Sequence, residues 1–283
     1  MDISLQSLIF FIITTIVYFS VPSIGKPQLT LNDITEIGVT PEFYTRNIKS
    51  LAFYLGVVIL VQLLLNIAYL TSKCGGAIDK NIGAAFVFTF IPWVLIFGVM
   101  LAVLVMFPGF KSAFSDVLGY YAVAGSANDI FSSIFIGTDI NDMIDKTSDP
   151  TKKNELTHAA EAIMKICGNK SILINQMNPD NFISVWNTLN PLMKTDIKNN
   201  PETINQIQTE LLNLVVLKDN IGEAFWYIYT AILISSIVYY NLATRGCVKN
   251  VDQIKADHDA YIKQQEETNK QSEINNSTTY TIS

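Results

Sequence analysis

The sequence predicts an all-α, polytopic membrane protein with about four transmembrane helices and a helical extramembrane domain between the third and the fourth. Three observations support this fold class. Only 16% of the 283 residues are charged, whereas soluble domains carry about a quarter. The mean hydropathy is positive, at +0.30. The apolar residues are also gathered into separate blocks along the chain.

Four of these blocks are long enough to cross a bilayer as helices, because a hydrocarbon core of about 30 Å requires about 20 apolar residues. They run from Leu5 to Ile24, from Leu51 to Thr71, from Ile82 to Phe107 and from Gly222 to Leu242. No ionisable residue lies in the middle of a block, and Glu223 stands at the edge of the fourth. Active transporters and voltage sensors need ionisable groups at such depths, so neither is expected.

The blocks divide the chain into six segments. The first lacks the basic residues that precede a cleaved signal peptide, so we interpret it as a retained, signal-anchor-like span. The last is rich in Gln, Glu, Asn, Ser and Thr, a composition that cannot bury enough apolar surface to fold. In order, the segments are a first transmembrane helix (1–24), a short loop (25–50), a transmembrane helical hairpin (51–107), a helical extramembrane domain (108–221), a fourth transmembrane helix (222–242) and a polar flexible tail (243–283).

Charge near the membrane favours an orientation with both chain ends inside. Five basic residues flank the spans on the side of the ends, and three lie in the opposite short loop. Since cytoplasmic loops carry an excess of Lys and Arg, segment 108–221 is expected outside or in a lumen. It carries nine lysines and thirteen acidic residues, net −4.

Three Asx-Pro pairs predict helix starts in segment 108–221, namely Asp149-Pro150, Asn178-Pro179 and Asn200-Pro201. The helix after Asn200-Pro201 could run with little interruption into the fourth span. No strand-like alternation of useful length occurs, so the domain is expected to be all-helical. The helix after Asn178-Pro179 has an apolar stripe at helical spacing, formed by Phe182, Val185, Trp186 and Leu189.

Two polar side chains occur within the second span. Gln62 and Asn66 are four residues apart and therefore lie on one helix face. Amides in lipid usually hydrogen-bond to neighbouring helices, so we interpret them as interhelical polar contacts. A polar pore lining is the alternative.

Two kinds of covalent modification are open to this chain. Cys74 and Cys247 both follow a span and share one side of the membrane, so they could be free thiols, lipidated by palmitoylation, or joined by a disulfide. Asn169 begins an Asn-Lys-Ser sequon in the large loop and is a glycosylation candidate.

Several function classes are not expected from the sequence. The net charge of −6 argues against nucleic acid as a partner. Two histidines and three scattered cysteines supply little material for a metal site. No nucleophile, phosphate-binding or zinc-protease motif occurs, so we expect no enzyme activity, catalytic residue or cofactor.

A segment after the third span has a distinctive pattern of glycine and aromatic residues. Its residues are Pro108, Gly109, Phe110, Phe114, Ser115, Gly119 and Tyr120. This pattern, followed by a helical loop and a last span, resembles uncharacterised multi-spanning membrane proteins of large double-stranded DNA viruses over residues 82–242. The resemblance implies a virion membrane protein under a capsid, located in the internal membrane of the virion and in a host endomembrane.

The same segment has two interpretations in physical terms. The Pro108-Gly109 pair ends the third span. The aromatic residues Phe110, Phe114 and Tyr120 could then lie in the headgroup layer as an interfacial segment. The alternative is an ordinary helix–turn–helix at the start of the domain.

The sequence therefore predicts a structural or scaffolding integral membrane protein. Its partners would be the lipid bilayer and other membrane or capsid proteins, and a homo-oligomer is compatible with the pattern. A channel or pore-forming oligomer is the alternative, and an entry or fusion component is a weaker one.

Overall fold

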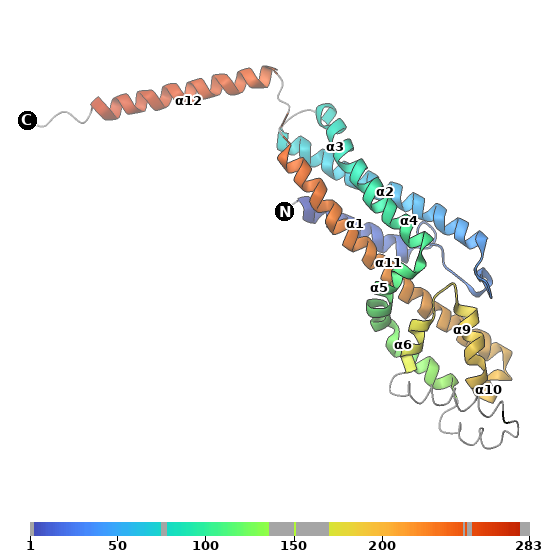
Figure 1. Cartoon of the computed structure of the whole chain (residues 1–283). Coiled ribbons are helices and arrows are strands. Elements are labelled where there is room, and N and C mark those ends of the chain that lie inside the picture. The colour runs from blue at the N-terminus through green and yellow to red at the C-terminus, as the bar shows by residue number, and fades with distance from the viewer. Residues whose placement is uncertain are drawn as a thin grey trace, which may run out of the picture.

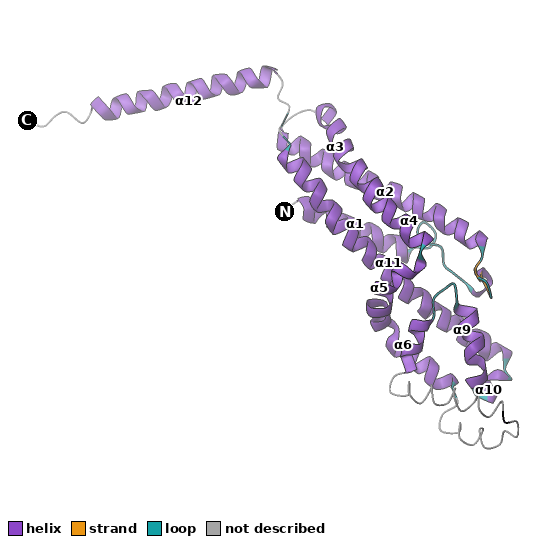
Figure 2. Ribbon diagram, in the orientation of Figure 1, coloured by secondary structure: helices purple, strands orange, loops and turns teal. Residues whose placement is uncertain are grey.

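The computed structural model is helical almost throughout (Figures 1 and 2). It describes residues 3–74, 78–135, 170–245 and 251–277, together with residues 150 and 247. Within these residues, three helices are long and apolar enough to cross a membrane. They are α2 (Pro41–Cys74), the continuous helix Asn81–Met106 and α11 (Pro201–Thr244). The predicted all-α fold class is confirmed, and three helices able to cross a membrane support the predicted membrane location.

The helix Asn81–Met106 contains a change of winding. It consists of α3 (Ile78–Pro92), a π-helical turn η2 (Trp93–Gly98) and α4 (Val99–Met106). Pro92 has no amide hydrogen to donate, and π-helical turns are a usual adjustment where the regular ladder is interrupted. The π turn begins at Trp93, the residue after this proline.

A fourth apolar helix, α1 (Ile3–Ser20), packs into the same bundle although it is shorter. The bundle interior is aromatic, with ring centroids of contacting pairs 4.4–6.1 Å apart. The buried rings belong to Phe11, Tyr18, Tyr54, Trp93, Phe97 and Tyr227. The outer face is also apolar, and includes Ile13, Phe53, Leu60, Leu64 and Leu95, all of which are exposed. An apolar surface of this extent suits lipid and not water.

The second module is a small helical domain below the bundle in Figure 1. Its elements are α6 (Tyr120–Ile134), the 3₁₀ turn η5 (Lys170–Gln176), α9 (Phe182–Leu189), the 3₁₀ turn η6 (Asn190–Leu192) and α10 (Thr195–Lys198), with the first half of α11. Its core contains the predicted stripe residues Phe182, Trp186 and Leu189. An antiparallel bridge between Phe135 and Met193 connects the end of α6 to the segment before α10.

Helix α11 belongs to both modules. It begins at Pro201, and the Asn200 side chain accepts a hydrogen bond from the Thr203 amide, as expected for an Asn cap followed by proline at the first helical position. Leu211 and Val215 lie in the domain core, and Tyr227 and Ile234 lie in the bundle core. The predicted continuation of this helix into the last span is therefore observed.

The short connection between α4 and α6 is made of three tight turns. The 3₁₀ turn η3 (Pro108–Lys111) follows the end of the third span, and a single α-turn α5 (Ser112–Phe114) leads to the π turn η4 (Ser115–Gly119). These turns bring the chain across α11, which contacts η3, α5 and η4.

Two segments are more ordered than the sequence predicts. The expected loop 25–50 contains the 3₁₀ turn η1 (Leu31–Asp33), a hairpin of β1 (Ile34–Thr35) and β2 (Gly38–Val39), and the first turns of α2. Gly38 permits the hairpin because its φ is +123°. The tail, expected to be flexible, contains α12 (Val251–Ser277). Gln, Glu and Lys form helices readily, so low apolar content does not prevent a solvated helix.

Candidate functional site

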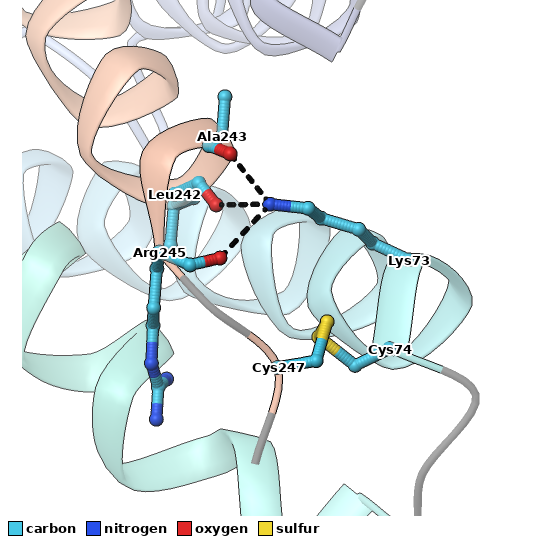
Figure 3. Close-up of a disulfide and its surroundings, with 6 residues drawn as sticks. All are labelled: Lys73, Cys74, Leu242, Ala243, Arg245 and Cys247. Carbon is cyan, nitrogen blue, oxygen red and sulfur yellow. Dashed lines mark hydrogen bonds between the residues drawn. A yellow bond between two sulfur atoms is a disulfide. The ribbon is translucent and has the colours of Figure 1, made fainter. Parts of the chain in front are cut away.

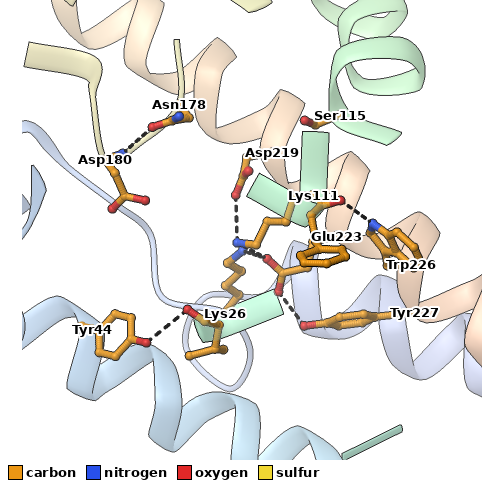
Figure 4. A network of polar contacts seen from close by, with 12 residues as sticks. Lys26, Tyr44, Lys111, Ser115, Asn178, Asp180, Asp219, Glu223, Trp226 and Tyr227 are labelled. Carbon is orange, nitrogen blue, oxygen red and sulfur yellow. Dashed lines mark hydrogen bonds and ion pairs between the residues drawn. The ribbon is translucent and has the colours of Figure 1, made fainter. Parts of the chain in front are cut away.

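A group of charged side chains is buried where the membrane bundle meets the domain (Figure 4). Glu223 of α11 accepts from Lys26 at 2.8 Å and is paired with Lys111 at 2.9 Å. Lys111 also pairs with Asp219 at 3.1 Å, and the Tyr227 hydroxyl donates to Glu223 at 2.5 Å. We call these five residues the polar junction. They connect the segment after α1, η3 and α11.

The polar junction is stable because its charges are mutually compensated. The Glu223 side chain is 5% exposed, and those of Lys26 and Lys111 are 10% and 15% exposed. Burial alone would lower the pKa of Lys111, but the carboxylates of Glu223 and Asp219 raise it well above its ordinary value. Lys111 is therefore held in its charged form, and removing one of its carboxylate partners would leave its buried charge less compensated.

Next to the polar junction, the chain crosses α11 at very close range. The α-carbon hydrogen of Gly222 faces Ser115, so that a β-carbon at Gly222 would lie 2.6 Å from that of Ser115. A β-carbon at Gly119 would collide with the backbone carbonyl of Lys218. The Lys218 ammonium in turn pairs with Asp116 at 2.6 Å. Gly119 and Gly222 are thus the residues that allow η4 to pack closely on α11.

Gly222→Val is expected to destabilise the protein by about 1–3 kcal/mol, as overpacking of a tight contact does. The β-carbon would meet the Ser115 backbone nitrogen at 2.7 Å, and backbone atoms cannot rotate away. Thermal unfolding of the detergent-solubilised protein measures the loss. Gly56→Val in α2, where a β-carbon meets nothing within 4 Å, is the matched control. Equal melting temperatures for the two variants would contradict the close crossing.

The predicted interfacial segment divides into two parts in the structure. Pro108, Gly109 and Phe110 form η3 beyond the end of α4, and the Trp226 indole donates to the Phe110 carbonyl at 2.9 Å. The Phe114 ring lies 5.1 Å from that of Trp226. These rings form an aromatic group beside the last span. Tyr120, in contrast, packs against the domain core, and its hydroxyl is 2.8 Å from Ser171. A position of Tyr120 in the headgroup layer stays a prediction.

The two amides of the second span are buried between helices. Gln62 accepts from the Ser7 hydroxyl, and its amide donates to the Ser7 carbonyl at 3.0 Å. The Asn66 amide donates to Thr89 at 2.8 Å. Gln62 is 1% exposed and Asn66 is 3% exposed. Within this chain both residues have the interhelical polar contacts expected of them, whereas a pore lining needs amides that face water.

At the opposite end of the bundle, a disulfide joins Cys74 and Cys247, whose α-carbons are 5.3 Å apart (Figure 3). Of the three states open from the sequence, the structure has the disulfide. The neighbouring Lys73 ammonium donates to the carbonyls of Leu242, Ala243 and Arg245 at 2.6–3.1 Å. These carbonyls have no partner within α11 because they end the helix, and a cation there also complements the helix dipole. The end of α2 is therefore connected to the end of α11 both by the disulfide and by the hydrogen bonds of Lys73.

The remaining sequence predictions on sites concern glycosylation and metals. Asn169 lies outside the described residues, as does the helix expected after Asp149. Among the residues that the structure describes, no group of three or more His, Cys, Asp or Glu side chains could hold a metal ion. Lys26, Lys111 and Asp219 were not singled out by the sequence. The one signal was Glu223, an acidic residue at the edge of an apolar block.

Comparison of the chain with protein-family models, curated proteins and solved structures finds no match.

Proposed function

We propose that this chain is a structural membrane protein that anchors its acidic helical domain to a bilayer and presents it to a protein layer. The observation that carries the proposal is the 44-residue helix α11, which contributes to both hydrophobic cores without a break. At about 1.5 Å per residue it is about 66 Å long, enough to span a bilayer and enter the domain. The proposed role needs no catalytic residue and no cofactor.

We further propose that α1 is a fourth membrane crossing. Its 18 residues cover about 27 Å as a helix, close to the thickness of the hydrocarbon core. Its outward side chains, Ile9, Ile13 and Ile16, are exposed and apolar, and its inward side chains Phe11 and Tyr18 are buried in the bundle core. This division is the one expected for a helix packed on protein along one face and on lipid along the other.

The partner of the domain is proposed from its charge and from the resemblance to viral membrane proteins. A net charge of −4 over segment 108–221 favours a basic protein surface. The resemblance implies a capsid protein, with the anchor in the internal membrane of a virion or in a host endomembrane. A homo-oligomer in the plane of the membrane would present several domains to one such layer.

The test is the composition and stoichiometry of the protein extracted from its native membrane. We expect mild detergent and chemical crosslinking to recover it with a protein partner in a fixed ratio, through contacts that map to the domain. Recovery as a freely diffusing monomer without crosslinked partners would contradict the anchoring role. Conductance of the purified protein in planar bilayers, reduced by Gln62→Leu, would support a pore instead.

A further inference from the structure

A cavity of about 120 Å³ opens on the polar junction. Its walls come from the segment after α1, the start of α2, the end of α4, the loop before α9 and the middle of α11. Lys26, Lys111, Asp219 and Glu223 form its inner end. Tyr44 and Asp180 stand on the other side, away from Trp226 (Figure 4).

Two hydrogen-bond acceptors in the cavity wall have no partner. The side-chain oxygens Oδ1 of Asn47 in α2 and of Asn220 in α11 are both buried from solvent and accept no hydrogen bond from the residues that the structure describes. A buried polar atom left unsatisfied destabilises the folded protein, and such atoms are few in native proteins. Two in the lining of one cavity indicate a ligand that donates hydrogen bonds.

The charge of the cavity indicates that this donor is a cation. Two lysines and three carboxylates line it, so its formal charge is −1. Both ammonium groups already pair with Glu223 and Asp219. The third carboxylate, Asp180, is exposed at the cavity wall, and no ion pair joins it to the described part of the chain. The groups left for a ligand are therefore two neutral acceptors and one anion.

The cavity lies at one end of the membrane bundle, and this position indicates the source of the cation. The cavity lies at the end of α4, where the third span stops at Pro108. Tyr44 lines it, is 42% exposed and donates to the Val105 carbonyl at 3.2 Å. Tyr and Trp side chains at the ends of spans usually mark the headgroup layer. A ligand entering here arrives at the depth of phospholipid headgroups.

We propose that the cavity binds the primary ammonium of an ethanolamine phospholipid headgroup. The ammonium has three N–H donors, and the cavity lining offers three groups to accept them, the side-chain oxygens of Asn47 and Asn220 and the carboxylate of Asp180. A choline headgroup carries the same charge but has no N–H donor and is bulkier. The proposal does not depend on the anchoring role, because lipid binding and partner binding are measured separately.

The experiment compares lipid retention by the full-length protein in native mass spectrometry. The protein is presented with equal amounts of phosphatidylethanolamine and phosphatidylcholine. Because a hydrogen bond to a charged group is worth about 1.5–3 kcal/mol, we expect a preference for phosphatidylethanolamine of about tenfold or more. Asn220→Leu and Asp180→Asn should each reduce this preference strongly. Asn213→Leu and Asp196→Asn, at exposed positions of α11 and α10, should leave it unchanged.

Three outcomes would overturn the proposal. Equal retention of the two lipids would show that the N–H donors are not recognised. An unchanged preference in Asp180→Asn, an exposed change that spares the buried core, would place the lipid elsewhere. Displacement of the lipid by free ethanolamine at equal concentration, or by Na⁺ or K⁺, would show that the site takes a soluble amine or a metal cation and not a lipid.

Discussion

Glu223→Ala is expected to lower the free energy of unfolding by about 3–5 kcal/mol, the usual cost of removing one partner of a buried ion pair. The substitution leaves Lys26 without its carboxylate and removes one of the two carboxylates that pair with Lys111. It also removes the acceptor of the Tyr227 hydroxyl. Equilibrium unfolding of the solubilised protein, followed by circular dichroism, measures the loss.

The matched control is Glu210→Ala, an exposed acidic residue two turns or more away on the same helix. It is expected to change stability by less than about 1 kcal/mol. Glu223→Gln should fall between the two, because the amide oxygen still accepts hydrogen bonds but carries no charge. If Glu223→Ala and Glu210→Ala have the same stability, the polar junction does not hold the two modules together.

The effect of Glu223→Ala should not depend on pH in the neutral range. The folded-state pKa of Lys111 is raised above its ordinary value. The stabilisation due to Lys111 is therefore fully present below that ordinary value and is lost only as the pH rises through the raised pKa.

Loss of the disulfide is the second large effect. The double variant Cys74→Ser, Cys247→Ser is expected to be about 2–4 kcal/mol less stable, because the bond closes a loop of 173 residues in the unfolded chain. In this variant the end of α2 is connected to the end of α11 only by the hydrogen bonds from Lys73 to the last carbonyls of that helix. Thermal unfolding with and without a reductant measures the change. Cys167→Ser, which leaves the disulfide intact, is the control.

The Cys74–Cys247 disulfide also gives information on the orientation of the protein in the membrane. Disulfides persist on the oxidising side of a membrane, so the disulfide assigns the end of α11 to that side. The count of basic residues favours the opposite orientation, by five against three. Labelling with a membrane-impermeant maleimide after mild reduction of intact vesicles decides between them. A reductant-insensitive melting temperature together with thiols that react before reduction would show that the bond does not form.

The helices were largely predictable from the sequence, for physical reasons. The apolar lengths that define α2, Asn81–Met106 and α11 are set by bilayer thickness and need no knowledge of neighbours. The start of α11 was predictable because Asn200-Pro201 is a local capping signal. The helix in the tail was not predicted, because the sequence argument considered only packing, whereas Gln and Glu favour a helix even without packing.

The polar junction was not predictable in the same way. Lys26 and Glu223 are 197 residues apart, and each looks like an ordinary charge at the end of an apolar block. Their pairing depends on how α1, η3 and α11 meet, which local periodicity does not determine. The same holds for Gly222, since nothing in its neighbourhood in the sequence shows that Ser115 crosses it.

The continuity of membrane bundle and domain through α11 is tested most directly by a distance measurement between them. Spin labels at Leu60→Cys in α2 and Ser132→Cys in α6, both exposed, are placed in a Cys167→Ser background. In lipid bilayers, pulsed electron paramagnetic resonance should give one narrow distance distribution, which Glu223→Ala broadens. A broad or multi-peaked distribution in the otherwise unmodified protein would mean that the domain swings on a hinge, and would contradict a rigid anchor.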